Sequence, residues 1–424
     1  MSRKNKILQL CIAVIFILVG ATSLFYFSGA HMSMLNIFES SEIENSEKNS
    51  IEKEQNEKND AKEQAVEEKT EEDIINEKAE EVLGRMTLEE KVGQLFIVDL
   101  EALNKGQTST EFTGIIQEKL KKYHVGGVIY FANNLVSREQ TIQLNEELQK
   151  NSSIPMFISV DEEGGSVARI ANNKNIGTTK FVSMREIGDS KDINKAYEVG
   201  FTIGKEINEL GFNLDFAPDA DVITNPNNTE IGSRSFGSDA DIVSEMVPQI
   251  VKGLHENNVC ATLKHFPGHG GSEANSHNEF SYTPQSLEGL RQVEFLPFKA
   301  GMKEDADFML VSHIAAPNVT GDNTPCSLSR IIITDILRDE LKYDNIVITD
   351  ALNMKAVADY YTPQQSSVAA LKAGGDMLLM PVSLDQAYNS VISACNEGEI
   401  SEERLNQSVK RILKVKIKRE IIEL

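Results

Sequence analysis

Eight short apolar runs recur along residues 79–424, and amphipathic stretches separate them. Each run has the length of a buried strand, and the stretches between them have the apolar spacing of helices that cover a sheet. The predicted strands are Val92–Val98, Gly126–Phe131, Pro155–Asp161, Phe212–Pro218, Val259–His265, Asp307–His313, Asn345–Asp350 and Asp376–Pro381. Strands that alternate with helices pair in parallel. Eight of them predict a closed (β/α)8 barrel of the TIM type, and a doubly wound open sheet is the alternative.

The stretches between the strands predict the outer layer of this α/β fold. The helices expected are Glu111–Tyr123, Glu139–Lys150, Ile193–Leu210, Ile242–Asn257, Leu287–Glu304, Ile331–Leu341, Val368–Ala373 and Leu384–Lys418. No hinge rich in proline, serine or charge divides residues 79–424, so we expect a single domain there.

Two segments of different composition precede this domain. Ile7–Phe27 is almost wholly apolar and follows three basic residues, which predicts a signal peptide or an N-terminal membrane anchor over residues 1–30. In both cases the rest of the chain is exported, and we expect an extracytoplasmic protein, secreted or anchored to the outer face of the cytoplasmic membrane. Residues 31–78 are rich in Glu, Lys, Asn and Ser, which predicts a disordered acidic linker.

The charge limits the possible partners of the chain, and the cysteines limit its possible disulfides. The formal net charge of −23 argues against nucleic acid as a partner. Beyond the apolar segment the cysteines are Cys260, Cys326 and Cys395, an odd number in apolar surroundings, which predicts free buried thiols rather than disulfides. No sequence feature indicates oligomerisation, so a monomer is expected.

Charged and imidazole side chains gather where the predicted strands end. They are Asp161, Asp219, Lys264, His265, His313 and Asp350. The carboxyl ends of barrel strands share one face, where barrel enzymes keep their active sites. We therefore expect these residues to surround one site.

The stretch Lys264–His277, KHFPGHGGSEANSH, holds three of the seven histidines of the chain. Its glycines and proline favour an open loop over a helix. His265 and His269 have the spacing of a metal-binding pair, but Pro267 and Gly268 remove the helix that would align them, so no metal site is predicted. The chain also lacks a phosphate loop and a dinucleotide-binding turn, so no cofactor is expected.

Residue types alone leave several roles open. Asp350 suits a nucleophile, a metal ligand or a helix N-cap. Asp161 and Arg169 suit the binding of sugar hydroxyls or a surface ion-pair cluster, and Arg234 lies in a loop where it would enter the pocket or meet solvent. Lys264 could instead be the Schiff-base amine of an aldolase-like barrel.

Six motifs together resemble the family 3 glycoside hydrolases, in their β-N-acetylglucosaminidase (β-N-acetylhexosaminidase) branch. The motifs are DEEGGSVARI (Asp161–Ile170), GFNLDFAPDADV (Gly211–Val222), IGSRSFG (Ile231–Gly237), KHFPGHG (Lys264–Gly270), a Ser-His pair downstream of it and ITDALNMKAV (Ile348–Val357). The resemblance covers about residues 79–424 and implies a single catalytic barrel that hydrolyses terminal β-linked N-acetylglucosamine with retention. The bacterial branch acts on peptidoglycan fragments, so the expected substrates are β-N-acetylglucosaminides such as cell-wall muropeptides.

The resemblance also implies a role for individual residues. Asp350 matches the nucleophile that forms a covalent glycosyl intermediate, and His277 matches the acid/base. The positions that hold the hydroxyls and the acetamido group of the sugar match Asp161, Arg169, Arg234, Lys264 and His265.

The chain departs from the family pattern beside the acid/base histidine. The pattern has an aspartate two residues before that histidine, as a partner for its ring, and here the position is Asn275. An amide can accept the ring N–H but adds no charge, so His277 should hold its proton less firmly. Glu273 is a possible substitute partner. The alternative reading is therefore a sugar-binding relative with little turnover.

Overall fold

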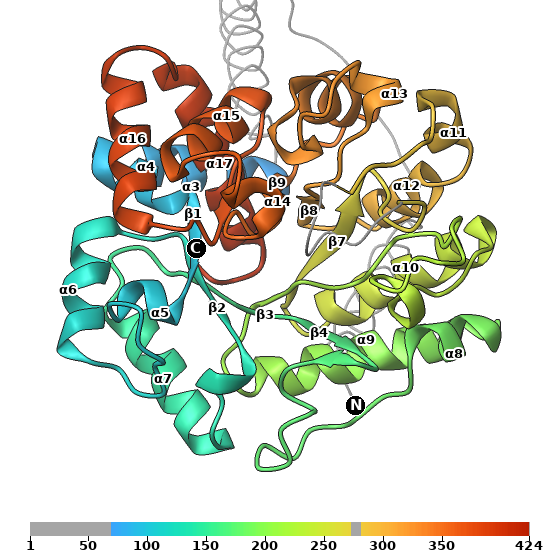
Figure 1. Ribbon diagram of the computed structural model, residues 1–424. Helices are drawn as coiled ribbons and strands as arrows, with labels where there is room; N and C mark the ends of the chain where they lie inside the picture. The colour runs from blue at the N-terminus through green and yellow to red at the C-terminus, as the bar shows by residue number, and fades with distance from the viewer. Residues whose placement is uncertain (1–68, 273–280, 424) are drawn as a thin grey trace, which may run out of the picture. The chain divides into compact units, whose positions relative to one another are not determined.

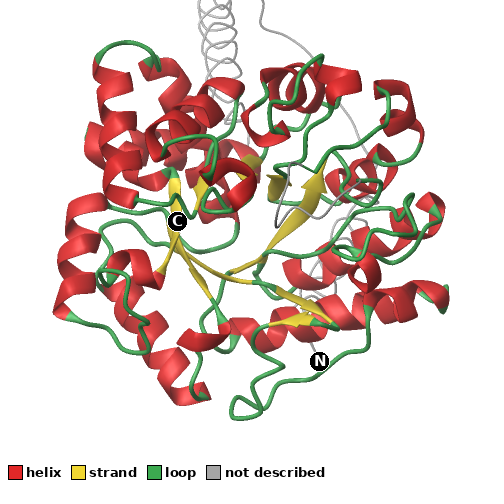
Figure 2. Ribbon diagram, in the orientation of Figure 1, coloured by secondary structure: helices red, strands yellow, loops and turns green. Residues whose placement is uncertain are grey.

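The computed structural model of the protein describes residues 69–272 and 281–423. In this part of the chain, eight parallel strands form a central sheet and helices surround it (Figures 1 and 2). The strand order is β10-β1-β2-β3-β6-β7-β8-β9. Ile348 pairs with Met377 beside the two ends of this order, which closes the sheet into a barrel. The predicted fold class is confirmed.

Each barrel strand falls in or overlaps one of the predicted apolar runs. The strands are β1 (Phe96–Asp99), β2 (Gly127–Tyr130), β3 (Phe157–Val160), β6 (Leu214–Asp215), β7 (Cys260–Phe266), β8 (Phe308–Val311), β9 (Ile346–Thr349) and β10 (Leu378–Leu379). The first predicted strand was wrong at its start, because helix α4 occupies Leu88–Gln94. The Thr87 side chain accepts from the Glu90 N–H, and the Glu90 side chain accepts from the Thr87 N–H. This reciprocal cap stabilises the first turn of the helix.

The described helices include all the predicted ones, with shifted ends. They are α3 (Glu71–Leu83), α4 (Leu88–Gln94), α5 (Leu100–Leu103), α6 (Gly114–Tyr123), α7 (Arg138–Lys150), α8 (Met184–Asp189), α9 (Ile193–Asn208), α10 (Ala240–His255), α11 (Leu287–Gln292), α12 (Phe295–Lys303), α13 (Pro317–Thr320), η4 (Ile331–Glu340), α14 (Lys355–Ala358), α15 (Pro363–Ala373), α16 (Leu384–Asn396) and α17 (Glu402–Lys418), with short turns η1 (Ala132–Asn134), η2 (Gly232–Arg234) and η3 (Cys326–Leu328).

Two of the predicted helices are each divided in two. The predicted helix Leu384–Lys418 breaks after α16, where Gly398 has φ 77° and Ser401 caps the start of α17. The predicted helix Leu287–Glu304 breaks between α11 and α12, where the buried Glu294 accepts a hydrogen bond from the Thr224 hydroxyl at 3.0 Å. The glycine at positive φ ends α16, and at the second break the backbone of Val293 leaves the helical region, with φ −128° and ψ −71°.

The segments expected to export and tether the domain fall mainly outside the described residues. The apolar segment of residues 1–30 and the linker up to residue 68 belong to this part. Helix α3 begins at Glu71, before the boundary placed at residue 79, and Thr70 caps it. No helix among the described residues is long and apolar enough to cross a bilayer. The three cysteines of the barrel are free thiols, as expected; Cys260 and Cys326 are buried, whereas Cys395 is only partly buried.

The amino-terminal end of the barrel is filled by side chains. Phe157 of β3 and Phe308 of β8 come from strands that are not neighbours, yet their rings lie 5.0 Å apart, so they meet inside the barrel. Lys416 of α17 is buried, and its Nζ lies 4.9 Å from the centre of the Phe157 ring. The same Nζ donates to Oε1 of Gln94 at 2.7 Å and to the carbonyl of Gly126 at 3.1 Å.

A second set of contacts ties α17 to the starts of the strands. Asp307, just before β8, accepts from Arg419 Nε at 2.9 Å and from the Ala261 N–H at 3.0 Å. Asp376, before β10, accepts from the Ser408 hydroxyl at 2.6 Å. These buried carboxylates are paired, as burial of a charge requires. The amino-terminal end is therefore sealed, and the opposite end is left for a site.

Replacing Lys416 by methionine tests this description of the sealed end. Burial lowers the pKa of Lys416 to about 7, whereas the unfolded chain has the ordinary value of 10.5. Folding therefore releases a proton between these values, and stability rises with pH. We expect the unfolding free energy of the wild type, relative to Lys416→Met, to rise by about 1.4 kcal/mol per pH unit between about pH 7.5 and 9.5 in urea titrations. A pH-independent difference would contradict the assignment.

Candidate active site

The described residues among those predicted to form a site lie at the carboxyl ends of barrel strands or in the loops that follow them. Asp161 follows β3, and Asp350 follows β9. Lys264 and His265 lie in the last part of β7, and Arg234 belongs to the turn η2 in the long loop after β6. The parallel sheet directs all these ends to one side of the barrel.

A small hairpin brings Arg169 back to Asp161. Its strands β4 (Glu162–Gly164) and β5 (Val167–Ala168) are antiparallel and were not predicted. Gly164 and Gly165 at the turn have φ 87° and 59°, a conformation that glycine adopts without strain. The Arg169 N–H donates to the carbonyl of Asp161 at 3.2 Å, and its Nη2 lies 3.5 Å from the Asp161 carboxylate.

The buried carboxylate of Glu163 joins two cations at the centre of the site. Arg234 donates to both of its oxygens, from Nε and from Nη2, each at 2.8 Å. Lys264 Nζ lies 2.5 Å from Oε1 of Glu163 and donates to Oδ1 of Asp161 at 2.8 Å. The bidentate guanidinium contact fixes the orientation of Arg234 as well as its position.

The pairing holds these groups in their charged forms. Burial opposes the charge on Glu163, but Lys264 and Arg234 hold the pKa of its carboxyl well below its usual range. Burial likewise opposes the charge on Lys264, and the carboxylates of Asp161 and Glu163 raise its pKa above the ordinary value. A Schiff base needs a neutral amine. The aldolase-like alternative therefore does not fit this lysine.

His265 extends the set of contacts through both of its ring nitrogens. Nη2 of Arg234 lies 3.1 Å from Nε2, and a guanidinium only donates, so Nε2 accepts. The ring proton is then on Nδ1, which donates to Oδ2 of Asp221 at 2.7 Å. Burial opposes a charge on this ring, while Asp221 raises its pKa overall. A second proton would face Arg234 and break that hydrogen bond, so we assign the neutral ring.

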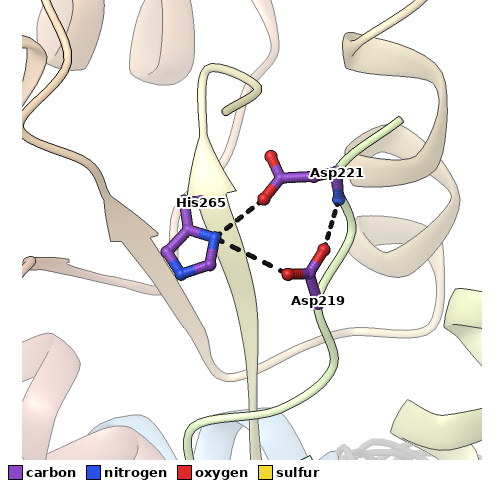
Figure 3. A group of neighbouring side chains, drawn as sticks. All are labelled: Asp219, Asp221 and His265. Atoms are coloured by element: carbon purple, nitrogen blue, oxygen red, sulfur yellow. Dashed lines mark hydrogen bonds and ion pairs between the residues drawn. The ribbon is translucent and has the colours of Figure 1, made fainter. Parts of the chain in front are cut away.

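Asp219 and Asp221 hold this imidazole from the loop after β6 (Figure 3). Oδ1 of Asp219 accepts from the Asp221 N–H at 3.0 Å, and its Oδ2 lies 3.9 Å from Nδ1 of His265. Oδ1 of Asp221 accepts from the His269 N–H at 2.5 Å.

Asp219, Asp221 and His265 also offer ligand atoms within 4.8 Å of one another, the kind of set that can hold a metal. The Nδ1 proton already lies between His265 and Asp221, and Arg234 Nε lies 3.8 Å from Oδ2 of Asp219. The Arg234 guanidinium thus already supplies a positive charge beside these carboxylates. The three residues therefore fit a hydrogen-bonded network better than a cation site.

Asp350 lies beside this network at the end of β9. Its N–H donates to the carbonyl of Val311 in β8 at 2.9 Å, and its Oδ1 accepts from the Ala351 N–H at 2.8 Å. Burial disfavours the carboxylate, yet the imidazoles of His313 and His265 when protonated at acidic pH, and the hydrogen bond from the Ala351 N–H, lower its pKa below the usual value. The carboxylate is therefore ionised at neutral pH, as a nucleophile must be.

All five predicted sugar-binding residues fall in one connected set of side-chain contacts. The chain of contacts runs Arg169, Asp161, Lys264, Glu163, Arg234, His265. Their roles toward a sugar stay predictions, as does the role of Asp350. His277, Asn275 and Glu273 lie outside the described residues.

Sequence reasoning missed the acids that hold this set together. Glu163 and Asp221 were not among the predicted site residues, although both lie inside the quoted motifs, and Asp219 was expected near the site but was given no role. The signal was available at Glu163, because a charged residue next to a strand end and a glycine pair is costly unless it has a partner. For Asp219 the signal was its place just past a predicted strand end, and for Asp221 the alternation with apolar residues carried no comparable signal.

A groove of about 1070 Å³ lies elsewhere, between α15 and α16. Its lining includes Val368, Lys372 and Asn389, and none of the residues of the network. Converging polar groups with shifted pKa values mark a site better than volume does. We therefore place the site at the strand ends.

Comparison with known proteins identifies the family of this barrel. The model of the Glycosyl hydrolase family 3 N terminal domain matches residues 87–415. The chain belongs to glycosyl hydrolase family 3. The family predicted from the motifs, and with it the enzyme class of glycoside hydrolases, is confirmed.

Similar members of family 3 carry related names. Beta-hexosaminidase A of Pseudoalteromonas piscicida is 33% identical over 328 residues, which cover 72% of this chain and 55% of that protein. Beta-hexosaminidase LpqI of Mycobacterium tuberculosis is 31% identical over 315 residues, covering 71% of this chain and 78% of that protein. The chain thus spans about half the length of the Pseudoalteromonas relative.

Solved structures of family 3 share this fold. A β-N-acetylglucosaminidase of Paenibacillus sp. FPU-7 superimposes with a TM-score of 0.75 at 35% identity, covering 79% of this chain and 63% of that one. LpqI of M. tuberculosis gives a TM-score of 0.69 at 28% identity, covering 79% of this chain and 95% of that one.

Asp219 gives this family 3 site a distinctive dependence of stability on pH. Burial and the neighbouring Asp221 carboxylate raise the pKa of Asp219 from 3.8 to about 7. The folded state therefore holds this proton more tightly than the unfolded state does, and the stabilisation is lost as pH rises toward 7. We expect the melting temperature of the wild type, relative to Asp219→Asn, to fall between about pH 4.5 and 7.5. If the melting temperature of the wild type rose with pH relative to that of Asp219→Asn, the raised pKa of Asp219 would be contradicted.

Proposed function

We propose that the protein is a retaining exo-β-N-acetylglucosaminidase that removes terminal β-linked N-acetylglucosamine. The ionised Asp350 carboxylate at the end of β9, beside a rigid set of charged donors and acceptors, carries this proposal. Membership of family 3 and the names of the relatives support the substrate class. An oxocarbenium-like transition state needs such a fixed anion next to the anomeric carbon.

In the first step, Oδ2 of Asp350 attacks the anomeric carbon of the sugar. Oδ1 stays bound to the Ala351 N–H. His277 gives its proton to the glycosidic oxygen, the bond between that oxygen and the anomeric carbon breaks, and the aglycone leaves as an alcohol. The sugar is then an ester of Asp350. The role of His277 rests on its place in the sequence motif.

In the second step, water resolves the ester. His277, now neutral, takes a proton from water while the water oxygen attacks the anomeric carbon, and the bond to Asp350 breaks. Two inversions at that carbon release the β anomer. An imidazole suits both steps because its ordinary pKa is close to neutrality.

The network supplies directed hydrogen bonds for a neutral sugar. Asp161 and Arg169 are its outer members, with 18% and 34% of their side chains exposed. Their free oxygens and N–H groups can reach hydroxyls, while Lys264 and Arg234 behind them are almost fully paired. A carboxylate and a guanidinium side by side discriminate sugar hydroxyls by geometry.

We further propose that the natural substrates are peptidoglycan fragments in which N-acetylglucosamine precedes N-acetylmuramic acid. Muropeptides of this kind occur outside the cytoplasmic membrane. The apolar segment Ile7–Phe27 and the acidic linker after it support a barrel that is secreted or tethered on that side of the membrane.

Replacing the nucleophile tests the activity. We expect the wild type to hydrolyse an aryl β-N-acetylglucosaminide, and Asp350→Asn to lower kcat/KM by about 10³-fold or more, since no ester can form. The exposed Asp359, which directly follows helix α14, offers a matched control, and Asp359→Asn should leave the rate unchanged. A wild type that binds N-acetylglucosamine but does not turn over would support the sugar-binding alternative.

Asn275→Asp addresses the departure from the family pattern. The added negative charge should raise the pKa of His277, because it favours the imidazolium. His277 then keeps its proton at higher pH, so the basic limb of the kcat/KM profile should shift to higher pH. A gain of less than about tenfold at the optimum fits an active wild type. A gain of several orders of magnitude would mean that the natural chain mainly binds sugar.

A further inference from the structure

His313 is buried at the end of β8, next to the candidate nucleophile, and has no role in the mechanism above. Its Nδ1 lies 2.7 Å from the Ser327 hydroxyl, and its Nε2 lies 3.0 Å from the carbonyl of Ala351. Both ring nitrogens therefore take part in hydrogen bonds.

The two contacts fix the protonation of the ring. A carbonyl oxygen only accepts, so Nε2 must carry a proton and donate it to Ala351. Burial lowers the pKa of His313 although Asp350 favours its charge, so the ring is neutral near pH 7. Nδ1 then carries no proton and accepts a hydrogen bond from the Ser327 hydroxyl. Ser327 thus selects the tautomer that donates to Ala351.

The backbone that His313 holds is the one that carries the nucleophile. The Asp350 N–H is bound to β8 through the Val311 carbonyl, and the Leu352 N–H donates to the Leu379 carbonyl of β10 at 2.8 Å. Between them, the Ala351 N–H donates to Oδ1 of Asp350 at 2.8 Å. The Ala351 carbonyl and N–H belong to adjacent peptide units joined at its Cα, so fixing the carbonyl restricts where the N–H, and with it Oδ1 of Asp350, can point.

We propose that His313 is a positioning residue for Asp350. Its Nε2–H fixes the Ala351 carbonyl, and with it the N–H that holds Oδ1, so that Oδ2 faces the sugar. This inference rests on the proposed role of Asp350 as nucleophile. Oδ2 is the oxygen that forms the ester.

The neutral ring is part of this arrangement. A charged imidazole would pair with Asp350 and weaken it as a nucleophile, whereas a neutral N–H orients the loop and leaves the carboxylate its charge. The same contacts exclude His313 as the acid/base, since neither nitrogen is free to exchange a proton with substrate.

Two amide variants separate positioning from general stability. In His313→Gln the side-chain nitrogen can reach the place of Nε2 and still donate to Ala351. In His313→Asn it reaches only the place of Nδ1, near Ser327. We expect His313→Asn to lower kcat by about 10- to 100-fold with KM within about threefold, because a misdirected carboxylate slows the chemical step more than binding. His313→Gln should recover most of the loss, and melting temperatures of the two variants should agree within a few degrees.

Equal losses of kcat in both variants, or a loss that follows the melting temperature, would overturn the proposal. A second measurement does not depend on activity. The ¹⁵N shifts of His313, assigned with His313→Asn, should show a proton on Nε2 and none on Nδ1 from about pH 6 to 8. The Asp350 carboxyl ¹³C signal, assigned with Asp350→Asn, should move in His313→Asn and return in His313→Gln.

The two proposals therefore fail in different ways. A wild type without turnover would defeat the proposed function, while the Asp350 signal would still decide whether His313 orients the carboxylate. An active wild type whose Asp350 signal is the same in His313→Asn would defeat the positioning role alone.

Discussion

The buried carboxylate of Glu163 is the interaction on which the site depends. It binds the guanidinium of Arg234 with both oxygens and also contacts the ammonium of Lys264. Each cation then orients a further group, Arg234 the ring of His265 and Lys264 the carboxylate of Asp161. Removing one partner of a buried ion pair leaves an uncompensated charge that costs about 3–5 kcal/mol, so these groups can only be arranged together. A sugar that meets this surface meets donors and acceptors that are already fixed.

The contacts that stabilise the barrel and the groups of the candidate site lie at opposite ends of the strands. At the amino-terminal ends of the strands, the helix α17 places Lys416 beside the ring of Phe157, and paired carboxylates of Asp307 and Asp376 join it to the sheet. At the carboxyl-terminal ends, loops carry groups whose charges are balanced only by one another. The rigid end allows the other end to hold a costly cluster of charges, which is the usual division of this fold.

The sequence was sufficient for the architecture because the barrel depends on local patterns. Buried parallel strands are short apolar runs, and each barrel strand appeared as one. One error lay at Val293, where the backbone leaves the helical region beside the hydrogen bond between Thr224 and Glu294. The other lay at Val92–Gln94, where a helix that begins with a local cap continues into an apolar run.

The site was predicted less completely than the fold. Motifs indicated Asp161, Lys264 and Asp350, but the pairing of Glu163 with Arg234 joins residues 71 positions apart and depends on the three-dimensional arrangement. The tautomers of His265 and His313 likewise follow from the partners of each ring nitrogen, which no spacing in the chain reveals.

The most direct test of the account is the anomer released first. When the chain hydrolyses an aryl β-N-acetylglucosaminide, ¹H NMR spectra recorded before mutarotation distinguish the two anomers of free N-acetylglucosamine. A covalent ester on Asp350 predicts that the β anomer appears first and the α anomer only later, by equilibration. Initial release of the α anomer would mean that water attacks the substrate directly and would contradict the assignment of Asp350 as nucleophile.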